Sequence, residues 1–136
     1  MKLIECVPNF SEGQNKQVID QIVMQITSVK GVKLLDVDPG KDTNRTVVTF
    51  AGHPDDVINA AFLAISKASQ LIDMKHHKGA HARMGATDVC PLIPISGVTE
   101  KECIEYSHKL AKKVGEKLKI PVFLYEKSAK AKNRQN

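Results

Sequence analysis

Three stretches with the apolar spacing of an α-helix alternate with short β-rich runs, and this alternation limits the chain to folds that pack helices on a sheet. The predicted helices cover residues 16–29, 54–72 and 99–118, and the predicted strands cover residues 2–7, 32–37, 46–51, 88–95 and 122–125. The order is β-α-β-β-α-β-α-β, and its first six elements form the split βαβ arrangement of ferredoxin-like folds. We therefore expect an α+β, ferredoxin-like fold in which helices cover one face of a mixed sheet.

Length and composition fit one compact domain followed by a short basic tail at residues 128–136, disordered or the start of a linker. No apolar run approaches the roughly 20 residues of a membrane span, and the N-terminus resembles no signal peptide. We expect a cytoplasmic protein without a membrane partner. Three cysteines without a CxxC spacing predict reduced thiols rather than a disulfide framework or a thiolate metal site.

The net charge of +5 raises the question of a nucleic-acid partner. An RNA-binding ferredoxin-like domain needs stacking aromatic residues on two strands and a K/R-G-F-like phrase. The chain has six aromatic residues, spread along its length, and no such phrase. We therefore expect no nucleic-acid partner.

The connection 73–87 reads DMKHHKGAHARMGAT and is longer than a compact domain needs unless it has a function or is disordered. Its glycines permit unusual backbone conformations, and its histidines can accept and return a proton near neutral pH. His81, two positions before Arg83, is the candidate base, although a solvated surface histidine has the same appearance. A metal held by the histidines has no recognised ligand spacing, so we expect none, and nothing in the sequence marks Cys90 as an activated nucleophile.

Two further segments are candidates for the same site. The connection DPGKDTNR, residues 38–45, contains carboxylates that a turn does not need, and Asp38 could orient a histidine. Ordinary turn chemistry explains the segment equally well. The segment VPNFSEG, residues 7–13, leaves the first strand and could place the Asn9 amide at the same sheet edge, but as a lone motif it is weak.

Taken together, the phrases VPNFSEG, LLDVDPGKDTNRTVVTF and HKGAHARMGATDVCPLIPISGVT closely resemble glutamate formiminotransferase (glutamate formimidoyltransferase), as in formiminotransferase-cyclodeaminase. The resemblance runs from about Leu3 to Ala129 and corresponds to the N-terminal subdomain, which we assign to residues 1–127. It implies transfer of the formimino group from N-formimino-L-glutamate to N5 of tetrahydrofolate, in histidine and one-carbon metabolism. Tetrahydrofolate would be the co-substrate.

The resemblance also implies the roles of particular residues. The family's catalytic histidine, in its H-x-R-M-G phrase, corresponds to His81, and its acidic partner in the D-V-D phrase corresponds to Asp38. Both substrates carry carboxylates, which need positive partners. Six residues are expected to bind substrate: Asn9, Asn44, Arg45, Lys78, Arg83 and Gly85. The family usually has proline between its histidine and arginine, where this chain has Ala82.

Family transferases join two similar subdomains and bind folate in the groove between them, and this chain ends about where the second should begin. A second chain or a second copy of this chain is therefore an expected partner. The alternative is a non-catalytic module that binds folate or assembles with a partner subunit through the same face. Binding without turnover would distinguish this alternative.

Overall fold

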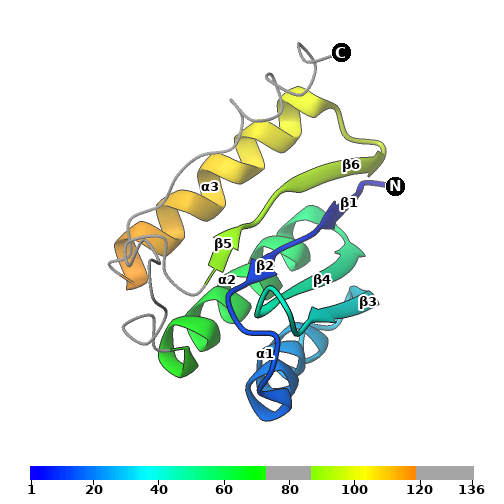
Figure 1. Cartoon of the computed structure of the whole chain (residues 1–136). Helices are drawn as coiled ribbons and strands as arrows, with labels where there is room; N and C mark the ends of the chain where they lie inside the picture. The colour runs from blue at the N-terminus through cyan, green and yellow to red at the C-terminus, as the bar shows by residue number, and fades with distance from the viewer. Residues whose placement is uncertain (73–86, 119–136) are drawn as a thin grey trace, which may run out of the picture.

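A computed structural model describes residues 1–72 and 87–118 (Figure 1). Three helices and six strands lie along these residues. The helices are where the hydrophobic spacing predicts them, but residues 9–10 form a strand that was not predicted, and the strand expected at 88–95 is divided at Cys90 and Pro91. The elements are β1 (Leu3–Cys6), β2 (Asn9–Phe10), α1 (Lys16–Thr27), β3 (Val32–Gly40), β4 (Arg45–Gly52), α2 (Pro54–Leu71), β5 (Thr87–Val89), β6 (Leu92–Ser96) and α3 (Glu100–Leu118). The strand expected at 122–125 and the tail at 128–136 lie outside the described residues.

Each helix begins at a capping residue that satisfies its first backbone N–H groups. The Asn15 side chain caps α1 by accepting hydrogen bonds from two backbone N–H groups. His53 Nδ1 accepts from the Asp55 N–H at the start of α2, where Pro54 occupies the first turn. Thr99 and Glu102 form the predicted capping box of α3, with Thr99 N to Glu102 Oε1 at 2.8 Å and Glu102 N to Thr99 Oγ1 at 3.0 Å.

The strands form one sheet in which every described pair is antiparallel. Strands β1 and β2 continue one another along a single line, and β4 pairs with both of them on one side and with β3 on the other. Strands β6 and β5 extend the opposite edge beyond β1 and β2. The mixed sheet that we expected is therefore not found among the described strands. The reason is that β4 lies between β1 and β3, which run parallel to each other but are not paired.

The hydrophobic core lies between the sheet and the helices. In Figure 1 the central strands pass in front of α2, which contacts both α1 and α3. Side chains that point toward the helices are buried, among them Ile4 and Cys6 of β1 and Val48 and Phe50 of β4. Helix α2 contributes four fully buried alanines, at positions 60, 61, 64 and 68, so its backbone packs closely against the strands.

The opposite face of the sheet, which we call the open face, carries the alternate residues of each strand. On β4 these are Val47, Thr49 and Ala51, all only half-buried, whereas their neighbours on the helix side are buried. On β3 a bulge places one extra residue, Leu35, between Leu34 opposite Phe50 and Asp36 opposite Thr49. Leu35 has no cross-strand partner, and Asp36 and Asp38 lie on the open face with their partners Thr49 and Val47.

No helix among residues 1–72 and 87–118 is long and apolar enough to cross a membrane.

Candidate functional site

One lateral row of the open face brings together two of the residues that the sequence pointed to. Asp38 of β3 is opposite Val47 of β4, and Val47 is in turn opposite Asn9 of β2. Cross-strand partners share a face, so Asp38 and Asn9 lie on either side of Val47, about two strand spacings or ~10 Å apart. Asp38 is exposed and Asn9 is half-buried. A carboxylate and an amide at this separation leave room for a small polar group between them.

Asn9 carries an unusual polar atom. Its Oδ1 is buried and, in the part of the chain that the structure describes, accepts no hydrogen bond. A buried carbonyl oxygen without a donor costs roughly 1–3 kcal/mol, so native proteins seldom keep one without a reason. An N–H donor from a ligand would satisfy this atom. The neighbouring strand has a second such atom, the Oγ1 of Thr87, whose strand position is opposite Phe10.

The β3–β4 turn is fixed by Asn44. This residue has a left-handed backbone with φ of 54°, which asparagine tolerates better than most residues. Its Oδ1 accepts a hydrogen bond from the backbone N–H of Gly13 at 2.8 Å. Asn44 was expected to bind substrate, and the structure gives its side-chain oxygen a contact within the protein. Arg45, the next residue, is exposed at the start of β4.

The candidate segments at residues 7–13 and 38–45 meet at Gly13. A Cβ built on Gly13 would lie 2.6 Å from Arg45 N and 2.7 Å from Arg45 O, closer than side chains approach backbone. Gln14 Nε2 donates to the Lys41 carbonyl at 3.1 Å, and Thr46 Oγ1 donates to the Glu12 carbonyl. Gly13 is therefore needed because the VPNFSEG segment lies directly against the turn that follows Asp38.

The histidine-rich candidate segment, residues 73–87, is described only at Thr87. His81, Lys78, Arg83 and Gly85 lie outside the described residues, as do the other histidines of the metal interpretation. Strand β5, which follows them, pairs with β2 so that Val89 is opposite Asn9 and Thr87 is opposite Phe10. The chain leaving the histidine-rich segment thus enters the sheet beside VPNFSEG.

Cys90 also lies near this junction. Its Sγ is 3.4 Å from the Sγ of Cys6, on the core side of the sheet. Burial, with the contact to Cys90 adding to it, raises the pKa of the Cys6 thiol well above its usual value. In the described residues we find no group of three or more metal-ligating side chains.

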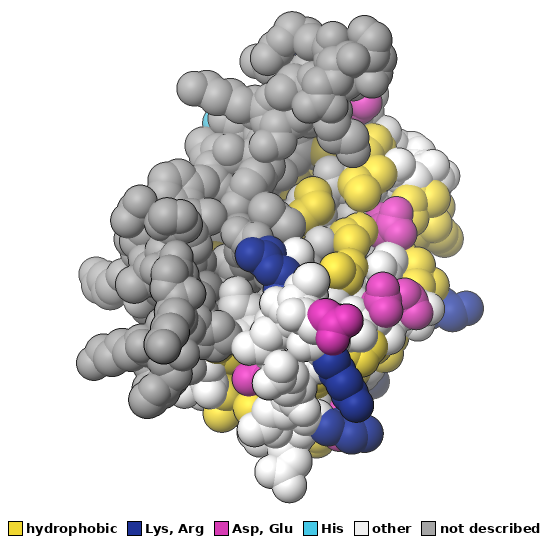
Figure 2. Space-filling model, in the orientation of Figure 1, with side chains coloured by type: hydrophobic (Ala, Val, Ile, Leu, Met, Phe, Trp, Pro, Cys, Tyr) yellow, Lys and Arg dark blue, Asp and Glu magenta, His cyan; other side chains and the backbone are white. Residues whose placement is uncertain are grey.

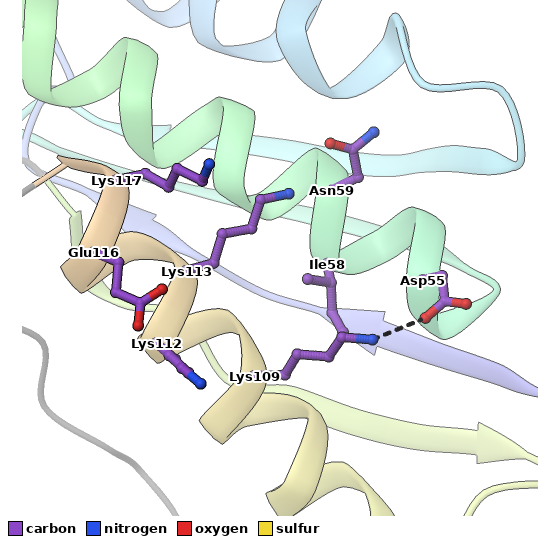
Figure 3. A pocket seen from close by; sticks show the side chains of 8 residues that line it. All are labelled: Asp55, Ile58, Asn59, Lys109, Lys112, Lys113, Glu116 and Lys117. Carbon is purple, nitrogen blue, oxygen red and sulfur yellow. Dashed lines mark ion pairs between the residues drawn. The ribbon is translucent and has the colours of Figure 1, made fainter.

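A groove among the described residues lies on the helix side of the molecule, away from the open face. This shallow groove of about 420 Å³ runs between α2 and α3 (Figure 3). It is lined by Asp55, Ile58, Asn59, Lys109, Lys112, Lys113, Glu116 and Lys117. Lys109 forms an ion pair with Asp55 at 3.6 Å, and both side chains are about two-thirds exposed. The groove contains no residue of the three candidate segments, and its lysines extend along a solvated helix face.

Sequence patterns did not point to Thr87 or to the structural role of Gly13. Thr87 stands at the start of a β-rich run, where threonine is common for packing reasons alone. Gly13 is one of several turn formers in its segment, and its need for space depends on a turn about 30 residues further along the chain. Neither residue carries a local signal that would have identified it.

Comparison with known proteins agrees with the phrases quoted above. The family model described as "Formiminotransferase domain, N-terminal subdomain" matches residues 3–136. Formimidoyltransferase-cyclodeaminase of Sus scrofa is 50% identical over 135 residues, which are 99% of this chain and 25% of that protein. Glutamate formimidoyltransferase of Streptococcus pyogenes serotype M1 is 49% identical over 99% of this chain and 45% of its own length. The enzyme of the same name from Thermoplasma acidophilum is 42% identical over the whole chain and 45% of its own length.

The chain thus spans between about a quarter and a half of the length of these relatives. The match is continuous and includes all three candidate segments. The chain belongs to the formiminotransferase family and corresponds to its N-terminal subdomain.

Proposed function

We propose that this chain supplies the proton-transfer half of a glutamate formiminotransferase, which moves the formimino group from N-formimino-L-glutamate to N5 of tetrahydrofolate. The observation that supports this most is the row Asp38, Val47 and Asn9 on the open face. The segment that contains the family's H-x-R-M-G phrase enters the sheet next to this row, at Thr87. In this proposal the carboxylate of Asp38, the amide of Asn9 and the histidine of the preceding segment act on one substrate at this surface.

The reaction needs one group that both removes and returns a proton. As N5 attacks the formimino carbon it forms a C–N bond and loses its proton, and the glutamate nitrogen must gain a proton before its own bond to that carbon breaks. His81 can accept the first proton and donate it in the second step. In this proposal the Asp38 carboxylate orients the imidazole and stabilises its protonated form.

Chain length permits this pairing. Five residues lie between His81 and Thr87, and the six chain steps from one to the other span at most about 20 Å. Asp38 is about three strand spacings, or ~15 Å, from the line of β5. The imidazole of His81 is therefore within reach of the carboxylate.

The remaining residues would bind the substrates. Asn9 Oδ1 accepts no hydrogen bond from the described residues, which suits an N–H of the formimino group or of the folate ring. Arg45, Lys78 and Arg83 are proposed to pair with substrate carboxylates, and Asn44 and Gly85 to line the same pocket.

The finer assignments of fold and context belong to the same proposal. The strand order β3, β4, β1–β2, β6–β5 supports a ferredoxin-like sheet. Residues 1–127 would form one subdomain with this fold. A cytoplasmic location fits the folate chemistry. The other half of the site would come from a second subdomain or from a second copy of this chain.

A non-catalytic module for folate binding or subunit assembly is the second candidate, and exposed apolar residues favour it. Leu35 is 49% exposed, Ile93 40% and Ile95 51%. Figure 2 shows hydrophobic and acidic side chains side by side on the face turned toward the viewer. Such a surface suits contact with another protein surface.

Single-turnover transfer by the protein that contains this chain tests the proposal. We expect His81→Ala and Asp38→Asn each to slow the transfer step by 100-fold or more, in line with the usual contribution of general acid–base catalysis. Asp36→Asn is the matched control, because Asp36 lies on the same face and strand, opposite Thr49. It should leave the rate within about twofold.

Folate binding without turnover, by wild-type protein of a mass that includes any partner, would favour the second candidate instead. Equal losses in Asp36→Asn and Asp38→Asn would show that only the overall charge of the face matters. That result would remove Asp38 from the mechanism.

A further inference from the structure

Two of the three cysteines are in contact although 84 residues separate them in sequence. The Sγ atoms of Cys6 and Cys90 are 3.4 Å apart, on neighbouring lines of the sheet. The Cys6 side chain has no solvent exposure, whereas Cys90 is partly exposed. Cys103, on α3, is buried and has no sulfur neighbour among the described residues.

The two cysteines differ in their backbone surroundings, because Cys6 lies within a paired strand and Cys90 lies between two strands. Cys6 belongs to β1, which is paired with Phe50 of β4 and with Leu92 of β6. Cys90 lies in the break between β5 and β6, where Pro91 follows it and accepts a hydrogen bond from the Val7 N–H at 3.2 Å. Because Cys90 belongs to neither flanking strand, fewer strand-pairing contacts constrain its backbone than constrain the backbone at Cys6.

We propose that Cys6 and Cys90 form a reversible dithiol–disulfide site that reacts with low-molecular-weight disulfides. Closing the bond requires the sulfur atoms to approach from 3.4 Å to about 2.05 Å, a shift of ~1.4 Å that the break at Cys90 and Pro91 accommodates. The proposal does not depend on the transferase assignment, because neither thiol lies in the row of Asp38 and Asn9.

The reaction proceeds by two exchanges. Cys90, the accessible thiol, loses its proton and attacks one sulfur of the small disulfide, which releases one small thiolate and leaves a mixed disulfide on Cys90. Cys6 then loses its proton and attacks the Cys90 sulfur, which releases the second small thiolate. The two protein thiols are oxidised and the small disulfide is reduced to two thiols, so atoms and electrons balance.

The different environments of the two thiols set the order of these steps. Burial raises the pKa of Cys6, so little of it is thiolate near neutral pH, which slows its attack on the mixed disulfide. The mixed disulfide on Cys90 should therefore accumulate first and then convert to the internal bond. Because deprotonation limits that conversion, its rate should increase roughly tenfold for each pH unit until the thiol titrates.

The test uses the purified chain, oxidised glutathione as the probe, and intact mass with peptide mapping as the readouts. Wild-type protein should gain one glutathione at early times and then lose it, ending lighter than the reduced protein by two hydrogen atoms. Mapping should recover one peptide pair that joins Cys6 to Cys90. Dithiothreitol should restore the starting mass.

Two variants separate this site from general thiol oxidation. Cys103→Ala, the matched control, should behave as wild type, and Cys90→Ala should show neither the transient adduct nor the internal bond. A stable glutathione adduct, a disulfide between two chains, or a link that includes Cys103 would overturn the proposal. Mapping of the wild-type protein decides the question even if Cys90→Ala does not fold.

Discussion

Replacing Gly13 by alanine tests whether the segments at residues 7–13 and 38–45 pack against each other as the structure indicates. The added Cβ would lie 2.6 Å from Arg45 N and 2.7 Å from Arg45 O, and also against Gly40 O. Ordinary contact begins near 3.4 Å, so the two backbones must separate by roughly 0.8 Å. These neighbours are backbone atoms in a paired hairpin and cannot rotate away.

The energy follows from two losses. Overpacking of this kind costs about 1–3 kcal/mol, and weakening the 2.8 Å hydrogen bond from Gly13 N to Asn44 Oδ1 adds roughly 0.5–1.5 kcal/mol. We expect Gly13→Ala to lower the free energy of unfolding by about 2–4 kcal/mol. With a urea m-value of about 2 kcal/mol per molar, the unfolding midpoint should fall by roughly 1–2 M.

Gly115→Ala provides the matched control. Gly115 lies within α3, and a Cβ there meets no atom within 4 Å. Alanine should stabilise this helix by roughly 0.5–1 kcal/mol, because glycine loses more backbone entropy on folding. The same substitution thus has opposite signs at the two positions. A Gly13→Ala midpoint equal to that of wild type, with an unchanged m-value, would refute the close packing of the turn against VPNFSEG.

Three further predictions concern stability. Asn44→Ala should lower the free energy of unfolding in urea by about 1–3 kcal/mol, because it loses a hydrogen bond and places alanine at φ of 54°. Asn44→Gly should cost less, because glycine adopts this angle without strain. Equal costs would mean that the backbone angle is unimportant. Thr99→Ala should lower the free energy of unfolding by about 1 kcal/mol, because it removes one half of the capping box. An NMR titration of this variant should still find a lowered pKa for Glu102, because the backbone N–H of residue 99 is the main cause of that shift. Burial raises the pKa of Cys103 from 9.0 to about 11, so its contribution to stability is fully present below pH 9 and is lost as the pH rises toward about 11. Melting temperatures should therefore fall over that interval by an amount equivalent to roughly 1–3 kcal/mol, and less steeply in Cys103→Ala; identical slopes would contradict the assignment.

The helices were predictable from sequence because their signals are local. Pro54 at the start of α2 and the pair Thr99 and Glu102 at the start of α3 mark boundaries that the structure confirms. The far end of β3 was not predictable, because Asp38, Pro39 and Gly40 are turn formers and yet continue the strand to Gly40. Pairing with β4 outweighs their local preference, since each of the three has a cross-strand partner.

The sequence could propose the residues of a candidate site, but not their arrangement. The alignment of Asp38 with Asn9 depends on the register of two strand pairs, and no pattern within either strand specifies it. The contact of Cys6 with Cys90 likewise depends on how the sheet is assembled, so counting cysteines predicted only separate reduced thiols. His81 was identified from the family phrase and remains a prediction.

The extra residue in β3 gives the protein a specific sensitivity to small changes in chain length. Side chains alternate between faces with a period of two, and Leu35 resets the phase of that alternation before Asp36. If Leu35 instead paired with β4 as a regular strand residue, Val37 would point to solvent and Asp38 would point toward the helices. A one-residue deletion or insertion between Asp36 and Asp38 would therefore exchange the buried and the exposed sides of the strand. Deleting Leu35 itself would keep Asp36 and Asp38 opposite their present partners. The residue of β3 that is easiest to delete is therefore next to residues whose strand register cannot change without moving them to the other face.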